Sequence, residues 1–174
     1  MEWLTILMAN SYRMPTTQQF CCMMIPTLVN PHSSPWAVLP AGIHAASLRE
    51  IEDVFTSNAK RRRLFAGLRL ACIALRDAGC KKLYVDGSFV TAKPIPGDYD
   101  ICWDPADVDP NRLDPVFLDF EEKRRNQKLK YGGEFFPFTW QVEPGKTYFE
   151  YFQNDRFTGQ PKGILSIDLT CEPL

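Results

Sequence analysis

Two acidic residues, separated by a single position, follow a glycine–serine pair in the middle of the chain. Residues 83–103 read LYVDGSFVTAKPIPGDYDICW, in which Gly87 and Ser88 follow one short apolar run and Asp98 and Asp100 open the next. Side chains at alternate positions of a strand point to the same face, so we expect the two carboxylates to lie side by side. Carboxylate oxygens are ligands that Mg²⁺ prefers, and the pair therefore predicts a divalent-cation site.

The Gly87-Ser88 pair has the composition of a phosphate-binding turn. Glycine lets the backbone approach a phosphate closely, while backbone amides and the Ser88 hydroxyl can donate hydrogen bonds to it. Nucleotidyl transfer requires that a triphosphate be held, neutralised and aligned with an attacking hydroxyl. A Gly-Ser turn and an acidic pair would serve opposite ends of such a ligand, with Mg²⁺, or Mn²⁺ in its place, as the cofactor.

The same residues also have a purely structural interpretation. Residues 96–98, Pro-Gly-Asp, would form a good turn in any protein, and acidic residues often follow turns. However, the next residues, 101–103, are Ile-Cys-Trp, which indicates a buried strand. Two carboxylates on one face of such a strand need a cation or hydrogen-bond donors to offset their repulsion, and this favours the metal site.

At this point the chain resembles the minimal nucleotidyltransferases, a group within the polymerase-beta-like superfamily. Their signature is a hydrophobic residue, Gly-Ser, a short spacer and then Asp-hydrophobic-Asp-hydrophobic. Residues 85–88 (VDGS) and 98–101 (DYDI) match it, with nine residues between Ser88 and Asp98. The resemblance extends over residues 39–170. Within the superfamily, this stretch is similar to a bacterial and phage group whose members often look like toxin–antitoxin or phage-defence components.

The resemblance implies roles for five residues. Asp98 and Asp100 would bind the metal, and Gly87 and Ser88 would seat the triphosphate. Glu134 is the candidate for the third carboxylate, a position where the superfamily more often has aspartate.

Two lysines are further candidates for the binding site because of their positive charge. Lys93 follows the Gly-Ser turn and could neutralise phosphate, and Lys162 precedes a glycine and an expected strand, where it could do the same for a nucleic-acid partner.

The activity implied by the resemblance is Mg²⁺-dependent transfer of a nucleoside monophosphate from a nucleoside triphosphate to a hydroxyl group, within a toxin or phage-defence system. The preferred acceptor is RNA, with the 3′ end of tRNA as the specific expectation. Two alternatives stay open: an AMPylating-type enzyme that modifies a protein hydroxyl, and a catalytically silent module that binds a nucleotide or a cognate toxin or antitoxin protein. Glu134 in place of aspartate is the feature that supports the silent module.

Composition limits the class of protein. With 174 residues, 45% of them hydrophobic, the chain can form one well-buried domain. Its net charge of −1 excludes an overall positive field, so any nucleic-acid binding would depend on local patches. Six cysteines without a C-x-x-C pair, and two histidines, His32 and His44, without a partner at ligand spacing, disfavour a zinc site. We expect a cytoplasmic protein with reduced thiols and without a membrane partner.

The elements that must position these residues can also be predicted. Five prolines within residues 1–40 indicate an irregular arm over residues 1–38, followed by the domain over residues 39–174. We expect an α/β (α+β) fold of the nucleotidyltransferase type, in which a small, mixed, twisted sheet carries the acidic residues and is flanked by helices.

Helix and strand signals occur throughout residues 39–174. Helices are expected after the capping boxes at Ser47 and Thr147, over residues 58–78 and over residues 115–130. Strands are expected from Leu83, after Asp100, over residues 134–138 and over residues 163–169. The basic residues 60–63 are interpreted as a solvated helical turn, with RNA contact as the alternative, and residues 123–130 as a solvated helix face. The aromatic residues between 148 and 152 are interpreted as core, with a platform for base stacking as the alternative.

Overall fold

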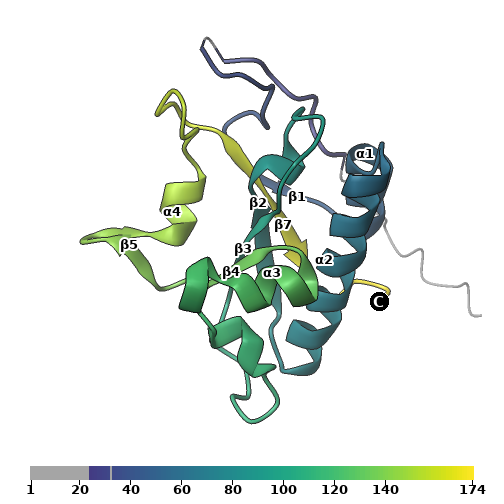
Figure 1. Cartoon of the computed structure of the whole chain (residues 1–174), viewed down its shortest axis with the longest axis vertical. Coiled ribbons are helices and arrows are strands. Elements are labelled where there is room, and N and C mark those ends of the chain that lie inside the picture. The colour runs from purple at the N-terminus through teal and green to yellow at the C-terminus, as the bar shows by residue number, and fades with distance from the viewer. Residues whose placement is uncertain (1–23, 32) are drawn as a thin grey trace, which may run out of the picture.

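The computed structural model describes residues 24–31 and 33–174, and within them the chain folds around one mixed five-stranded sheet (Figure 1). The strand order is β1-β7-β2-β3-β4, with β5 and β6 forming a separate pair. The strands are β1 (Gly42–Ala45), β2 (Lys82–Asp86), β3 (Asp100–Trp103), β4 (Glu134–Pro137), β5 (Gln141–Glu143), β6 (Lys146–Thr147) and β7 (Gly163–Asp168). The expected fold class, a small mixed sheet flanked by helices, is confirmed.

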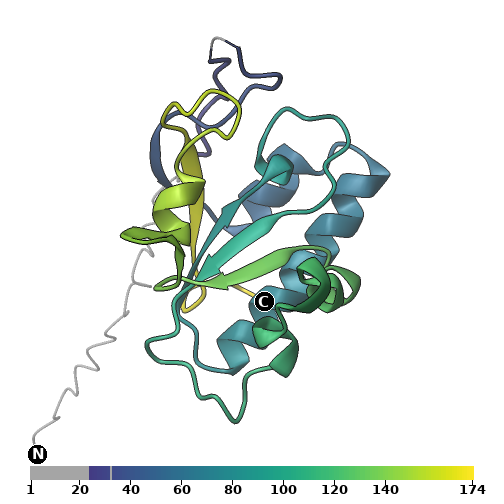
Figure 2. The same ribbon diagram turned by 60° about the vertical axis from the view of Figure 1, so that its left-hand side comes forward.

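Helices cover both faces of this sheet, but unequally. The α-helices are α1 (Leu48–Phe55), α2 (Ala59–Asp77), α3 (Arg125–Tyr131) and α4 (Tyr148–Phe152), and the 3₁₀ helices are η1 (Ser88–Val90), η2 (Pro115–Leu118) and η3 (Glu121–Lys123). The α1 and α2 helices lie on one side of the sheet and the short α4 lies on the other, as Figure 2 shows from a second direction. One face is therefore fully covered, while the other is covered only in part.

The register of the strands determines which acidic residues lie next to one another in the sheet. Strand β2 is antiparallel to both β3 and β7, whereas β4 is parallel to β3. In this register Asp86 of β2 pairs with Asp100 of β3, and Asp100 pairs with Glu134 of β4. Paired residues on neighbouring strands point to the same face, so these three carboxylates form a row across the sheet.

The predicted helix starts are confirmed by their caps. The hydroxyls of Ser47 and Thr147 each accept a hydrogen bond from the backbone of the glutamate three residues later, and that glutamate bonds back to the cap. Asn58 caps α2 in the same way through the amide of Arg61. The apolar residues of α2 that recur at three- and four-residue steps are all buried: Leu64, Phe65, Leu68, Ala71, Cys72 and Leu75.

The two faces of the sheet bury different clusters. Leu83, Val85 and Ile101 point to the large core beneath α1 and α2. A small cluster lies on the other face, where Cys102 and Phe136 contact residues of α4 and β7. The aromatic residues of α4 belong largely to this small cluster, as expected, although Tyr151 is 42% exposed. The small cluster fills only the part of this face that lies beside the acidic row.

The predicted helix over residues 115–130 is wrong in its first half. The segment contains two 3₁₀ turns, η2 and η3, and only residues 125–131 form an α-helix. Glu122, Lys123 and Arg124 have positive φ angles of 44°, 56° and 59°, which interrupt the helical path. Asp119, which accepts a hydrogen bond from the backbone of Glu121, helps to fix this turn.

The arm over residues 1–38 is only partly described. Residues 1–23 lie outside the described residues, as does His32, so the expectations for Cys21 and Cys22 fall there too. The segment from residue 24 onward is irregular, apart from an isolated bridge between Val29 and Val38. Val38 is buried, so the end of this arm packs onto the domain.

The described cysteines carry free thiols. Cys72, Cys80 and Cys102 are buried, and Cys171 is exposed. Burial raises the pKa of Cys80 to about 11, which keeps this thiol protonated at neutral pH. Within residues 24–31 and 33–174, no helix combines the length and the apolar composition needed to cross a bilayer.

Candidate active site

The acidic row lies at one end of the half-covered face of the sheet. Asp86, Asp100 and Glu134 come from three adjacent strands, and Asp98 precedes Asp100 by two positions. The residue between the two aspartates, Tyr99, is fully buried in the large core, where its hydroxyl donates a hydrogen bond of 2.7 Å to the Tyr131 carbonyl. Alternation along the chain therefore places the aspartates on the opposite side from Tyr99.

A cleft of about 540 Å³ opens over this row. All seven residues predicted to form the site line it: Gly87, Ser88, Lys93, Asp98, Asp100, Glu134 and Lys162. The remaining walls come from the arm, through Trp36 and Val38, and from residues 148–157. Residues that are far apart in the sequence thus meet around one cavity, and the described part of the arm forms one of its walls.

Asp100 lies at the centre of the row and has no cationic partner in the described part of the chain. Burial raises the pKa of its carboxyl well above the ordinary value, and the negative charges of Asp86, Asp98 and Glu134 raise it further. The charge of Lys162, which contacts Asp86, only partly offsets this increase, so the acidic row contains one carboxylate that forms no ion pair of its own with the described residues.

The Gly-Ser turn is packed directly against this carboxylate. Gly87 has a φ angle of +84°, and a Cβ atom at this position would lie 2.5 Å from Oδ2 of Asp100. Only glycine fits both the backbone conformation and the available space. The sequence motif is thus a packing requirement, because the turn and the acidic pair can approach each other only without a side chain at position 87.

Lys162 forms an ion pair with Asp86, the acid of the row that lies on β2. Its ammonium contacts Oδ1 of Asp86, and only 10% of the lysine side chain and 8% of the aspartate side chain are exposed. Burial nevertheless raises the pKa of Asp86, since the favourable charge of Lys162 does not fully offset it. Lys162 reaches the cleft, as predicted, but its closest partner is a carboxylate that the sequence motif did not single out.

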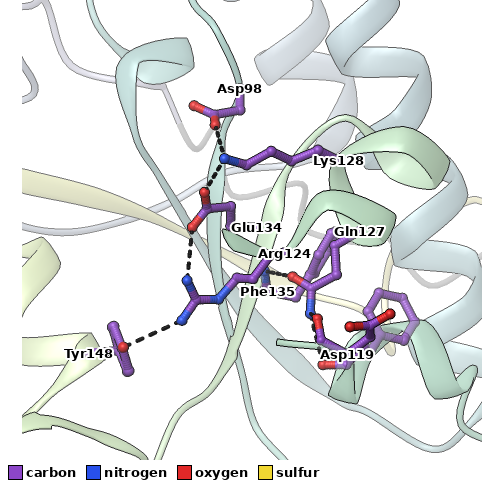
Figure 3. A network of polar contacts seen from close by, with 9 residues as sticks. Asp98, Asp119, Arg124, Gln127, Lys128, Glu134, Phe135 and Tyr148 are labelled. Atoms are coloured by element: carbon purple, nitrogen blue, oxygen red, sulfur yellow. Dashed lines mark hydrogen bonds and ion pairs between the residues drawn. The ribbon is translucent and has the colours of Figure 1, made fainter. Parts of the chain in front are cut away.

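Lys128 of α3 lies between Asp98 and Glu134 and contacts both (Figure 3). Its Nζ lies 3.3 Å from Oδ2 of Asp98 and also contacts Oε1 of Glu134. Burial lowers the pKa of Lys128, but its contacts with Glu134 and Asp98 outweigh this effect, so that the pKa is raised. Lys128 is therefore a charged residue of the site that the sequence interpretation missed.

Arg124 forms the wall next to Lys128. Its guanidinium lies 4.1 Å from the centre of the Phe136 ring, and Nη1 lies 3.3 Å from Oε2 of Glu134. Nη2 lies 3.5 Å from the Tyr148 hydroxyl, as Figure 3 also shows. The interpretation of residues 123–130 as a solvated face is therefore wrong for Arg124 and Lys128. No local signal distinguished them, because Arg124 precedes α3 with a left-handed backbone and does not share a helical face with Lys128.

A further missed residue, Arg61, holds the loop that follows the Gly-Ser turn. It is only 4% exposed, and its guanidinium donates hydrogen bonds to the carbonyls of Phe89, Thr91 and Lys93 at distances of 2.7, 2.7 and 2.5 Å. The solvated-turn interpretation of residues 60–63 is wrong at this position. Arg61 fixes the backbone on both sides of η1 and thus the approach of Lys93 to the cleft.

The donor set fits a hard divalent cation at two of the three expected ligands. Asp98 and Asp100 offer carboxylate oxygens, and Asp100 has no counter-ion, which is the condition in which a buried carboxylate gains most from a cation. Across residues 24–31 and 33–174, however, no three acidic, histidine or cysteine residues are grouped so that they could hold a metal ion. Glu134 is held by Lys128 and Arg124 instead.

Comparison with known proteins gives a family but no activity. The model of a family described as "Family of unknown function (DUF6932)" matches residues 31–168. No curated protein and no solved structure matches the chain. The matched residues include every residue of the acidic row and of the Gly-Ser turn, and they begin inside the segment assigned to the arm.

Proposed function

The chain belongs to DUF6932, a family of unknown function, and we propose that it is a Mg²⁺-dependent nucleotidyltransferase. The observation that carries this proposal is the convergence of the Gly-Ser turn and the Asp98–Asp100 pair on one cleft, where the buried Asp100 carboxylate forms no ion pair with any residue that the structure describes. A triphosphate bound with a divalent cation would satisfy both halves of this arrangement.

The proposed reaction transfers a nucleoside monophosphate. The acceptor hydroxyl oxygen attacks the α-phosphorus, the bond from this phosphorus to the bridging oxygen breaks, and pyrophosphate leaves. Asp98 and Asp100 would hold Mg²⁺, which when bound neutralises phosphate charge and aligns the reacting groups. Glu134, whose carboxylate faces the same cleft, would accept the proton of the hydroxyl.

Phosphate binding is assigned to the turn and to Lys93. Gly87 and Ser88 line the cleft, where the Ser88 hydroxyl lies 3.5 Å from the Asp98 carbonyl, and Arg61 fixes the backbone carbonyl of Lys93. In the part of the chain that the structure describes, Lys93 forms no ion pair, so its ammonium is available for a phosphate group. Lys162 instead neutralises the charge of Asp86, so its proposed role is to stabilise this carboxylate and not to bind phosphate.

RNA is the acceptor that the cleft favours, with the 3′ end of tRNA as the first one to test. Trp36, Tyr151 and Phe157 line the cleft and are 36%, 42% and 53% exposed. Exposed aromatic rings can stack on bases of a single strand, a contact that protein hydroxyl acceptors do not need. The net charge of −1 is consistent with recognition of a short end and not of a long duplex.

The test is transfer of label from each α-labelled nucleoside triphosphate to total RNA or to lysate protein, in Mg²⁺ or Mn²⁺. We expect labelled RNA, and a loss of about 100-fold or more in Asp98→Asn and Asp100→Asn, because these carboxylates support the charge that develops on phosphate. Asp107→Asn is the matched control, since this aspartate is 57% exposed and pairs with Lys81 outside the cleft. Label in protein would identify a protein-modifying enzyme, and no transfer to either acceptor would contradict the proposal.

A silent nucleotide-binding module is the second candidate. The contacts of Lys128 with both Asp98 and Glu134 favour it, because they neutralise two of the three expected metal ligands. Such a module would bind a labelled triphosphate without transferring it, and binding would survive in both Asp98→Asn and Asp100→Asn. The nucleotidyltransferase instead requires that these variants lose metal-dependent binding together with transfer.

A further inference from the structure

We propose that Lys128 is an internal counter-ion that bridges Asp98 and Glu134 in the metal-free protein and leaves them when a divalent cation enters the cleft. The inference rests on the proposed function, since it concerns the same cation site. Its basis is the position of the Lys128 ammonium, which contacts Glu134 and lies 3.3 Å from Asp98 (Figure 3). This is the space in which Asp98 and Glu134 would share a metal.

The charges around the row show why a bridging cation is needed. Asp86, Asp100 and Glu134 are paired across three neighbouring strands, and Asp98 lies two residues before Asp100. Lys162 compensates Asp86, and Arg124 and Lys128 both contact Glu134. Lys128 is the one cation among the described residues that also reaches Asp98. Removal of its charge would leave neighbouring carboxylates uncompensated, which strengthens their attraction for any other cation.

Of the three cations, Lys128 is the one able to leave. Its side chain is 36% exposed, against 20% for Arg124 and 10% for Lys162. Arg124 is also fixed by its stacking on Phe136 and by the Tyr148 hydroxyl. A lysine ammonium is a strongly hydrated point charge on a flexible stem, so it can move from a carboxylate to water at little cost.

The consequence is a competition between Lys128 and the metal. While the ammonium lies between Asp98 and Glu134, these two acids cannot both turn their oxygens to a second cation. Entry of a metal therefore requires that the Lys128 ammonium move away from Asp98 and Glu134. The free energy needed to break these two contacts is subtracted from the free energy of metal binding. Lys128 would thus reduce the metal affinity of the empty site.

The first experiment measures binding of Mn²⁺ to the full chain without nucleotide, by the loss of the free Mn²⁺ signal in electron paramagnetic resonance. We expect the Kd to fall about 10-fold or more in Lys128→Met, and to stay equal or rise in Lys128→Arg, which keeps the charge and can contact two carboxylates. The matched control is Lys130→Met, which removes the same charge from the same helix, because Lys130 pairs with Asp114 outside the cleft. Its Kd should stay within about 2-fold of the wild-type value, since exposed charges at a distance are screened.

The outcomes separate this inference from the proposed function. If the wild type binds Mn²⁺ and Asp100→Asn abolishes binding, but Lys128→Met binds no more tightly than Lys130→Met, the inference is wrong and the metal site stands. If Mn²⁺ binds to neither the wild type nor Lys128→Met, both the inference and the metal-dependent function are wrong.

A second experiment uses the wild-type protein, so that it does not depend on the folding of a variant. The rate at which an amine-specific acylating reagent labels Lys128 is followed by mass spectrometry with and without Mg²⁺, and Lys130 serves as the internal reference. Withdrawal of the ammonium predicts faster labelling of Lys128 when Mg²⁺ is present, with no change at Lys130. Equal or slower labelling of Lys128 at Mg²⁺ concentrations that saturate the site would overturn the inference.

Discussion

Two lysines meet the acidic row of the cleft, and they do so in opposite ways. Lys162 contacts one carboxylate, Asp86, in a pair of which only 10% and 8% of the side chains are exposed. Lys128 is shared between Asp98 and Glu134, and 36% of its side chain is exposed. The first pair is therefore buried, whereas the second is partly exposed to solvent.

This difference indicates different roles for similar contacts. A buried charge cannot lose its partner without a large penalty, because water is not available to replace it. An exposed ammonium can return to water, so its contact contributes little to folding. The Asp86–Lys162 pair should therefore support the fold, while Lys128 should chiefly affect what the cleft binds.

The largest effect is expected when the buried pair is broken. Lys162→Met leaves Asp86 enclosed without a cation, and we expect the free energy of unfolding at neutral pH to fall by about 3 to 5 kcal/mol. The measurement is urea unfolding followed by circular dichroism, with Lys130→Met as the exposed control. A loss no larger than that of the control would remove the distinction between the two lysines.

The same variant should show a dependence on pH. Burial raises the pKa of Asp86, so a protonated carboxyl suits the folded state better than the unfolded state. The penalty of Lys162→Met therefore vanishes below the pKa of Asp86 in the folded wild type, which lies above the ordinary value of about 3.9, and grows as the pH rises above it. Unfolding curves of variant and wild type should converge toward pH 4 and separate toward pH 7. A constant separation would show that Asp86 does not cause the loss.

Removal of both charges should restore much of the stability. In Asp86→Leu with Lys162→Met, neither charge of this pair is left buried without its partner, and we expect a free energy of unfolding within about 1 kcal/mol of the wild type. A double-mutant cycle with the two single variants measures the coupling. Additive losses would mean that the two side chains act independently.

A smaller effect is expected for the shared lysine. Lys128→Met should lower the free energy of unfolding by no more than about 1 kcal/mol, because partly exposed ion pairs contribute little. Thermal or urea unfolding compared with Lys130→Met checks this value. A loss similar to that of Lys162→Met would show that Lys128 is structural, which would also oppose its exchange for a metal.

The smallest effect concerns salt. Raising the ionic strength to about 1 M shortens the Debye length to about 3 Å, which screens exposed charges far more than buried ones. The stability difference between wild type and Lys128→Met should then nearly vanish, while that of Lys162→Met persists. Unfolding curves at low and high NaCl concentration compare the two directly, and an equal salt response in both variants would contradict the comparison.

Local signals predicted the elements well where the chain obeys local rules. The capping boxes at Ser47 and Thr147 begin α1 and α4, and the apolar repeat of residues 58–78 forms α2. These features depend on contacts within one turn of helix or on one helical face, which the sequence spells out directly. The alternation around Tyr99 likewise placed Asp98 and Asp100 on one face.

The failures occurred where distant contacts outweigh such signals. Residues 115–130 have the composition of a helix, but three positive φ angles divide the segment, and Arg124 and Lys128 both contact Glu134. Arg61 looked like one of several solvated cations, yet carbonyls around η1 surround it. No local pattern reports which backbone carbonyl or carboxylate a long cationic side chain will meet.

The sequence by itself determined the Gly-Ser turn, the acidic pair, the capped helices and the strands that carry them, because each follows from periodicity or from the conformational freedom of single residues. The tertiary structure decided how the charges are compensated: Asp86 with Lys162, Glu134 with Arg124, and Lys128 between two acids. The physical reason is that a carboxylate accepts any cation within reach, and only the packing of strands from distant parts of the chain sets which cation that is.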